Sequence, residues 1–180
     1  ANNTSFIRSL EYIFSKTRSV MPRMPRLVVP GYAHHVTQRG NRRQNTFFNE
    51  QDYAMYLALI AEAKLEAGCD IWAYCLMPNH VHLVIDTSVQ VQGLKKDEIN
   101  AENYKQLDVI MQLIKGGSSF DINKVLNQTG KFWQLESYDH YARSVEELSR
   151  IIWYVVNNPV KAKLVKEWTD FPFTYCGRSL

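Results

Sequence analysis

Two apolar runs separated by Pro78-Asn79 constrain the fold of this chain most strongly. Ile71–Met77 and His80–Ile85 are rich in residues that favour strands, whereas the proline-asparagine dipeptide does not suit a continuing strand. The segment therefore predicts two neighbouring β-strands. Side chains alternate between the faces of a strand, so His80 and His82 project to the same face.

Two imidazoles on one face of a strand can form half of a metal site. Imidazole binds many divalent cations, and a strand holds its side chains more rigidly than a loop does. However, a chain with five histidines can contain such a pair by chance, and a strand histidine is often simply hydrogen bonded. The motif therefore needs a second constellation to support it.

A helix near the C-terminal end provides that constellation. Ser144 and Glu147 have the spacing of a capping box, and Pro159 marks the end of the helix. Tyr154 and Asn158 lie four residues apart, on a different face from the apolar stripe. The plainer alternative is a tyrosine half-packed on a sheet and an asparagine at a polar helix terminus.

The remaining patterns predict a single α+β domain. In chain order we expect a strand at about 32–38, a helix capped by Asn49, the two strands described above, a connecting loop over 87–103, a helix at about 104–115 ended by Gly116-Gly117, a short helix near 120–126, a strand at about 132–140 and the tyrosine helix. This order is typical of a ferredoxin-like antiparallel sheet covered by helices on one face, with the tyrosine helix appended.

Four ordered blocks of the chain resemble the HUH single-tyrosine transposases, and most closely the transposases associated with repetitive extragenic palindromes. The blocks are Tyr32–Gln44, Met77–His82, Phe132–Gln134 with Tyr138–His140, and Tyr154 with Asn157–Ala162. They keep the order of the family and extend over about residues 21–173.

The resemblance implies a metal-dependent endonuclease and strand transferase that acts on single-stranded DNA near hairpins. The implied nucleophile is Tyr154, which would form a 5′-phosphotyrosine, and the implied metal ligands are His80, His82 and Asn158. Asparagine is a weak neutral ligand, which favours a hard cation such as Mg²⁺ or Mn²⁺. His35, His140 and Arg150 are candidate assisting groups.

The charge distribution fits a nucleic-acid partner without establishing one. The net charge is only +3, but a basic turn follows the first expected strand. Phosphate contacts are provided by arginine and lysine, so we expect DNA-binding roles for a group of cationic side chains. These are Arg39, Arg42, Arg43, Lys115 and Lys161.

We expect two parts in the chain: an N-terminal extension of unknown role over residues 1–20, and one catalytic domain over residues 21–180. No continuous apolar stretch is long enough to cross a bilayer, so no membrane partner is expected. Three cysteines without paired zinc spacing argue against a disulfide framework and favour the cytoplasm, with nucleoid association when DNA is bound. Relatives implied by the resemblance act as monomers or as helix-exchanged homodimers, and the sequence leaves that choice open.

Two other functions remain compatible with the sequence. One is a catalytically silent nucleic-acid-binding protein with the same fold, which would tolerate Tyr154→Phe. The other is a nuclease in which His80 and His82 hold a metal that activates water, so that no protein–DNA adduct ever forms.

Overall fold

Five antiparallel strands form the centre of the molecule. The computed structural model describes residues 29–177 apart from 126, 128, 136 and 137, so the expected extension over residues 1–20 lies outside the described residues. The strands are β1 (Ala33–Arg39), β2 (Asp70–Met77), β3 (His80–Asp86), β4 (Tyr138–Tyr141) and β5 (Thr174–Cys176). They pair in the order β4-β1-β3-β2-β5, which confirms the predicted antiparallel sheet.

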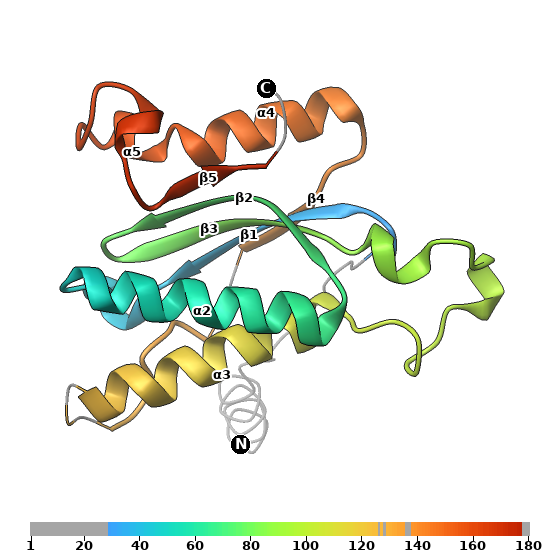
Figure 1. The fold of residues 1–180 in the computed structure, drawn as a ribbon, viewed down its shortest axis with the longest axis horizontal. Coiled ribbons are helices and arrows are strands. Elements are labelled where there is room, and N and C mark those ends of the chain that lie inside the picture. The colour runs from blue at the N-terminus through green and yellow to red at the C-terminus, as the bar shows by residue number, and fades with distance from the viewer. Residues whose placement is uncertain (1–28, 126, 128, 136–137, 178–180) are drawn as a thin grey trace, which may run out of the picture.

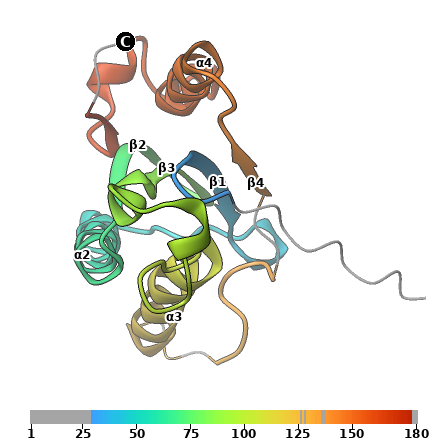
Figure 2. The same ribbon diagram turned by 90° about the vertical axis from the view of Figure 1, so that its right-hand side faces the viewer.

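Helices cover both faces of the sheet. Figures 1 and 2 show α2 (Glu50–Ala67) and α3 (Leu107–Val125) on one face, and α4 (Val145–Val156) on the other. The short helix α5 (Asn158–Lys161) follows α4 directly. The expected helical layer and the appended tyrosine helix therefore lie on opposite faces of the sheet.

Each face buries its own apolar cluster. The cluster beneath α2 and α3 contains Val36, Leu83 and Ile85 from the sheet with Tyr56 and Ile110 from the helices. The cluster beneath α4 is smaller and consists of Ala33, Ala73, Cys75, Met77, Val84, Ile152, Val155 and Val156. Because strand side chains alternate, this second cluster shares a face with His80 and His82.

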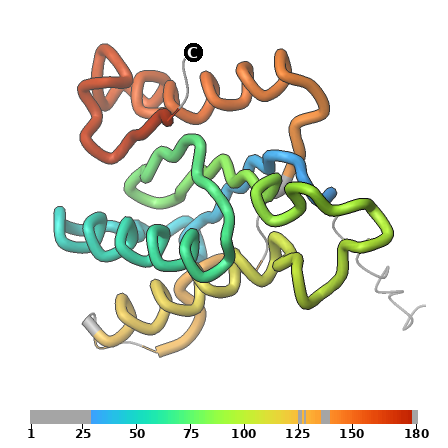
Figure 3. Tube along the Cα trace, turned by 45° about the vertical axis from the view of Figure 1, so that its right-hand side comes forward, coloured from blue at the N-terminus to red at the C-terminus, as the bar shows by residue number. Residues whose placement is uncertain are grey.

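The connection from β3 to α3 extends past the end of the sheet, as Figure 3 shows. It contains two short 3₁₀ turns, η2 (Ser88–Val91) and η3 (Lys96–Glu98), and agrees with the predicted loop over 87–103. Two further 3₁₀ turns, η1 (Asn41–Arg43) and η4 (Trp168–Asp170), follow β1 and precede β5.

Helix α3 is longer than the sequence predicts. The expected end at Gly116-Gly117 is wrong, because the helix continues to Val125 and absorbs the short helix expected near 120–126. The buried face that begins at Leu107 extends through Ile114 to Ile122. Packing of that continuous apolar face outweighs the low helix propensity of the two glycines.

The strands at the two edges of the sheet also differ from the prediction. The expected strand at about 132–140 is wrong in its first part, where Trp133 makes only an isolated bridge to Gly40. β4 begins at Tyr138, and β5 at the opposite edge was not predicted. Strands of three or four residues are too short for an alternating pattern to be recognised.

Two turns pack together at the end of the sheet where the histidine strand begins. The backbone N–H of Gly40 donates to the Asn79 carbonyl at 3.0 Å, and the N–H of Thr46 donates to the Pro78 carbonyl at 2.7 Å. A Cβ at Gly40 would lie 2.5 Å from the Gln44 carbonyl, so only glycine fits there. This contact fixes the start of β3 against the basic turn.

Candidate active site

The polar part of the α4 face is built from two neighbouring strands. In the antiparallel register Thr37 lies opposite His82, and Arg39 lies opposite His80. His35 points to the same face, because it lies two residues before Thr37 along β1. The alternation that buries Val36 on the other face therefore aligns these polar side chains.

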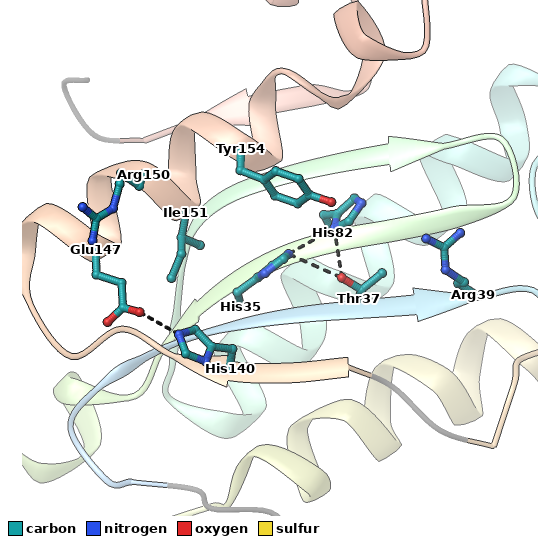
Figure 4. Close-up of a pocket in the computed structure, with 9 residues that line it drawn as sticks. All are labelled: His35, Thr37, Arg39, His82, His140, Glu147, Arg150, Ile151 and Tyr154. Carbon is teal, nitrogen blue, oxygen red and sulfur yellow. Dashed lines mark hydrogen bonds and ion pairs between the residues drawn. The ribbon is translucent and has the colours of Figure 1, made fainter.

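Helix α4 covers only part of this face and leaves a pocket beside it. Ile152, Val155 and Val156 pack over Ala73, Cys75 and Val84, and this apolar contact fixes the rotation of the helix. The remaining space is a cavity of about 540 Å³, shown in Figure 4. Its lining residues are His35, Thr37, Arg39, His82, His140, Glu147, Arg150, Ile151 and Tyr154.

Tyr154 extends from α4 into this pocket. Its ring centroid lies 5.6 Å from that of His82 and 5.8 Å from that of His35, and Figure 4 shows its hydroxyl directed toward His82. The side chain remains 40% exposed, so a substrate can reach it. The Lys161 ammonium lies 4.3 Å from the centroid of the same ring.

His82 is buried and hydrogen bonded on one side only. Its Nδ1 lies 3.0 Å from Thr37 Oγ1 and 3.0 Å from His35 Nε2. Its Nε2 is buried and has no hydrogen-bond partner among the described residues. The neighbouring ring of His80 lies 5.0 Å away, and His80 Nδ1 is 2.6 Å from Asn79 Oδ1.

Burial keeps these histidines neutral. Loss of hydration lowers the pKa of His80 to about 4 and that of His82 to about 2, with Arg39 contributing in both cases and His35, His80 and Lys161 also contributing to His82. The pKa of His35 falls to about 4, mainly through burial and secondarily through His140. Neutral imidazole is the form that binds metal ions, so the pair is already in its ligand form at pH 7.

A second polar group closes the other end of the pocket. His140 Nε2 lies 2.8 Å from Glu147 Oε1, and the Arg143 backbone N–H donates to Glu147 Oε2 at 2.8 Å. The hydrogen bond from His140, followed by that from Arg143, lowers the pKa of Glu147. Arg150 lines the pocket one turn further along α4.

The sequence predicts Asn158 on the same helix as Tyr154, but in the structure Asn158 lies beyond the end of α4 and begins α5. The helix ends at Val156, and the Asn158 side-chain Nδ2 donates to the carbonyls of Tyr154 at 2.8 Å and Val155 at 3.2 Å. Neither Asn158 nor His80 is among the residues that line the cavity. Because its amide nitrogen is used within the chain, Asn158 has its amide oxygen to offer a ligand.

The side chains expected to bind DNA lie in three separate parts of the structure. Arg39 lines the pocket and Lys161 lies over Tyr154, whereas Arg42 and Arg43 form the exposed turn η1 at the end of β1. Lys115 lies on α3, and its ammonium donates to the Gln134 carbonyl at 3.2 Å. Lys115 thus belongs to the helical layer opposite the pocket.

Several pocket residues were not predicted from the sequence. Thr37 has a detectable signal, since it follows His35 at the period of a strand, and Glu147 was recognised only as a capping residue. No group of three histidine, cysteine, aspartate or glutamate side chains suitable for a metal ion occurs in the described part of the chain. The donors available are two imidazoles with an amide or hydroxyl oxygen, which fit a cation completed by phosphate oxygens.

Comparisons with solved structures concern the fold of the chain. A REP-associated tyrosine transposase bound to a REP hairpin matches 86% of this chain and 82% of its own, with a TM-score of 0.63 and 22% identity, and shows the same fold. A crystal structure of a candidate transposase from Deinococcus radiodurans R1 matches 75% of this chain and 96% of its own, at a TM-score of 0.45 and 15% identity. No curated protein matches the chain.

Within the described residues no helix is both long enough and apolar enough to span a membrane. A family model matches part of the chain. Residues 28–95, which include β1, α2 and the histidine strand, match the model of the IS200-like transposases. Over this segment, which is less than half of the chain, the sequence is similar to the IS200-like transposases, and the fold is that of the REP-associated tyrosine transposase.

Proposed function

We propose that this protein is a transposase that cleaves and rejoins single-stranded DNA next to a hairpin, through a covalent bond between Tyr154 and a 5′-phosphate. The observation that carries the proposal is the approach of Tyr154 to His82, at 5.6 Å between ring centroids, in a cavity open to solvent. We take residues 21–180 as the catalytic domain.

The chemistry requires charge neutralisation at phosphorus. A divalent cation such as Mg²⁺ or Mn²⁺, held by His80, His82 and the Asn158 amide oxygen, would polarise the phosphodiester and stabilise its transition state. The structural support is the unpartnered Nε2 of His82 and the neutrality of both imidazoles.

Tyr154 would then exchange one phosphate ester for another. The bond between its phenolic oxygen and phosphorus forms while the bond from phosphorus to the 3′-oxygen breaks. The phenol loses its proton, and the released 3′-oxygen gains one, so cleavage and rejoining are nearly balanced in energy. His35, His140 and Arg150 are available to assist these transfers, since all three line the cavity with Tyr154.

Recognition of DNA would extend outward from the pocket. Arg39 lines the cavity and Lys161 lies over the Tyr154 ring, so both would contact the cleaved phosphate, and Arg42 and Arg43 follow the end of β1. Lys115 would contact DNA only on the far layer of the molecule. The solved relative is bound to a REP hairpin, which supports a hairpin-bearing single strand as the partner of this chain.

The deciding experiment uses hairpin-bearing single strands labelled at either end, incubated with Mg²⁺ or Mn²⁺ and resolved on a denaturing protein gel. We expect a metal-dependent adduct that carries the label from the 3′ side of the cut and is absent in Tyr154→Phe. Tyr141→Phe, which removes a phenol outside the cavity lining, is the matched control and should keep the adduct.

Two results would contradict the proposal. Cleavage with no adduct would indicate a metal-activated water in place of the tyrosine. Tight binding without cleavage of any strand in a library of hairpins and flanking sequences would indicate a silent DNA-binding protein.

A further inference from the structure

We infer that Thr37 and His35 are positioning residues that fix the tautomer of His82, so that its Nε2 lone pair faces the pocket. The inference rests on the proposed function, because it concerns the orientation of a metal ligand. It goes beyond that proposal by assigning a role to two side chains that need touch neither metal nor DNA.

The first observation is the crowding around a single nitrogen. His82 Nδ1 has two neighbours at 3.0 Å, Thr37 Oγ1 and His35 Nε2. A neutral imidazole carries one N–H and one lone pair, so the two ring nitrogens have opposite roles. If Nδ1 carries the hydrogen, Thr37 and His35 both offer it an acceptor.

The second observation disfavours the opposite tautomer. With the hydrogen on Nε2, Thr37 and His35 would both have to donate to the single lone pair on Nδ1. The Nε2–H of His82 would then be a buried donor without an acceptor among the described residues. Orphaned buried N–H groups are rare in proteins, whereas an unpartnered lone pair on Nε2 is what a cation requires.

The placement of the two residues is fixed by the sheet. Thr37 is the direct cross-strand partner of His82 in the β1–β3 register, and the ring of His35 stacks on that of His82 at 5.3 Å between centroids with 21° between planes. Thr37 Oγ1 also lies 3.4 Å from His35 Nε2. The three side chains therefore form one connected group, held by rigid strands.

His80 shows the same orientation by a separate contact. Its Nδ1 lies 2.6 Å from Asn79 Oδ1. A carboxamide oxygen can only accept, so Nδ1 of His80 carries the hydrogen and Nε2 carries the lone pair. Both histidines of the pair would thus present the same ring nitrogen.

The test measures the tautomer directly, without metal or DNA. In protein labelled with ¹⁵N-histidine, long-range ¹H–¹⁵N spectra distinguish a protonated from an unprotonated ring nitrogen. We expect His82 to show a protonated Nδ1 in the wild type and a mixture of tautomers in Thr37→Val, which keeps the shape of the side chain. Thr37→Ser should restore the wild-type spectrum.

A second readout is the affinity for Mn²⁺ measured by calorimetry on the metal-free protein. Loss of an outer hydrogen-bond partner of a metal-ligating histidine weakens metal binding by about 10- to 100-fold, so we expect that loss in Thr37→Val and recovery in Thr37→Ser. Equal thermal melting of the variants would show that folding is unaffected.

A protonated Nε2 in wild-type His82, or a Thr37→Val spectrum identical to the wild type, would overturn the inference. Failure of the proposed function is distinguishable, because it appears as a missing adduct or as no Mn²⁺ binding in the wild type. The tautomer of His82 is measured independently of both.

Discussion

Lys161 and Tyr154 make a cation–π contact beside the pocket. The spacing of the two residues in the sequence does not predict this contact. The ammonium lies over the tyrosine ring at 4.3 Å from its centroid, and the two residues come from different helices. A cation over the face of an aromatic ring is attracted to its π electrons, so this contact holds the tyrosine ring and the ammonium together. We therefore expect Lys161 to orient the proposed nucleophile, in addition to its proposed contact with DNA.

Replacing Lys161 should slow chemistry more than it weakens binding. An exposed cation–π contact contributes about 0.5–1 kcal/mol, so Lys161→Met should lower the single-turnover rate constant of adduct formation by about two- to fivefold. Lys166→Met removes the same charge at an exposed position further along the chain and serves as control. Equal rate constants for the two variants would limit Lys161 to binding DNA.

The candidate site could be predicted in part because it combines two local patterns. His80 and His82 share a face through the alternation of a strand, and Tyr154 lies on a helix with clear start and end signals. The register between β1 and β3 decides which other side chains surround these residues. That register brings Thr37 beside His82, and no spacing within one segment can reveal it.

At the scale of elements, helix α3 shows that local helix propensity can predict the wrong helix end. Glycine lowers helix stability by about 0.5–1 kcal/mol relative to alanine, which is why Gly116-Gly117 reads as a helix end. The stability of α3 comes instead from its buried face, which is not visible until α2 and the sheet are in place. Helix α2 was predicted correctly, because Asn49 and Asp52 form a local capping box.

Substituting the two glycines tests whether α3 is continuous. Gly116 is exposed and a Cβ there would meet nothing within 4 Å, so Gly116→Ala should raise the free energy of unfolding by about 0.5–1 kcal/mol in urea titrations. A Cβ at Gly117 would lie 2.8 Å from Leu59 Cδ2, so Gly117→Ala should stabilise less. A destabilised Gly116→Ala variant would support a helix that ends at Lys115.

The start of α4 depends on a carboxylate, and this gives it a pH dependence. Glu147 accepts hydrogen bonds from His140 and from the Arg143 backbone, and these lower its pKa below the ordinary value of 4.5. A carboxyl group with a lowered folded-state pKa stabilises the protein above its unfolded pKa. That contribution disappears as the pH falls through the folded value.

Glu147→Gln should therefore remove part of the acid sensitivity of the fold. We expect the variant to be less stable than the wild type at neutral pH, with the difference shrinking as the pH falls below 4.5. Glu62→Gln removes a charge of the same sign from an exposed position on α2. A difference for Glu147→Gln that stays constant from pH 7 to about pH 3 would contradict a role for its ionised form.

At the scale of the whole molecule, the basic turn after β1 combines backbone strain with charge. Arg42 and Arg43 both have positive φ, at 53° and 61°, a conformation that disfavours residues with a side chain by about 1–2 kcal/mol each. The chain nevertheless places two arginines there, beside the strand that leads into the pocket. Strained residues often occur at functional sites, so this turn is a candidate for DNA contact.

Replacing both arginines with glycine should separate stability from binding. The double variant should be at least as stable as the wild type in urea titrations, while its affinity for hairpin DNA falls and its salt dependence flattens by about one unit of slope per lost phosphate contact. Arg42→Lys with Arg43→Lys should keep the slope. A glycine variant with an unchanged slope would remove this turn from the DNA interface.

The placement of α4 favours a site completed within one chain. Only residues 142–144 connect β4 to α4, and the segment after α5 returns to form β5 in the same sheet. Both ends of the tyrosine helix are therefore attached to the sheet that carries His82, one at each edge (Figure 1). Ile152, Val155 and Val156 add about 1.5–3 kcal/mol each through burial against that sheet.

Mixing two inactive variants tests this arrangement. Tyr154→Phe keeps an intact histidine pair, and His82→Ala keeps an intact tyrosine, so a dimer that exchanged α4 would rebuild one complete site from the two. Residues 142–144 span at most about 3.5 Å each, so they cannot carry α4 to a second subunit while β5 stays paired with β2. We therefore expect the mixture to form no adduct. Adduct formation by the mixture, dependent on protein concentration, would instead require the helix to leave its own sheet and β5 to unpair from β2.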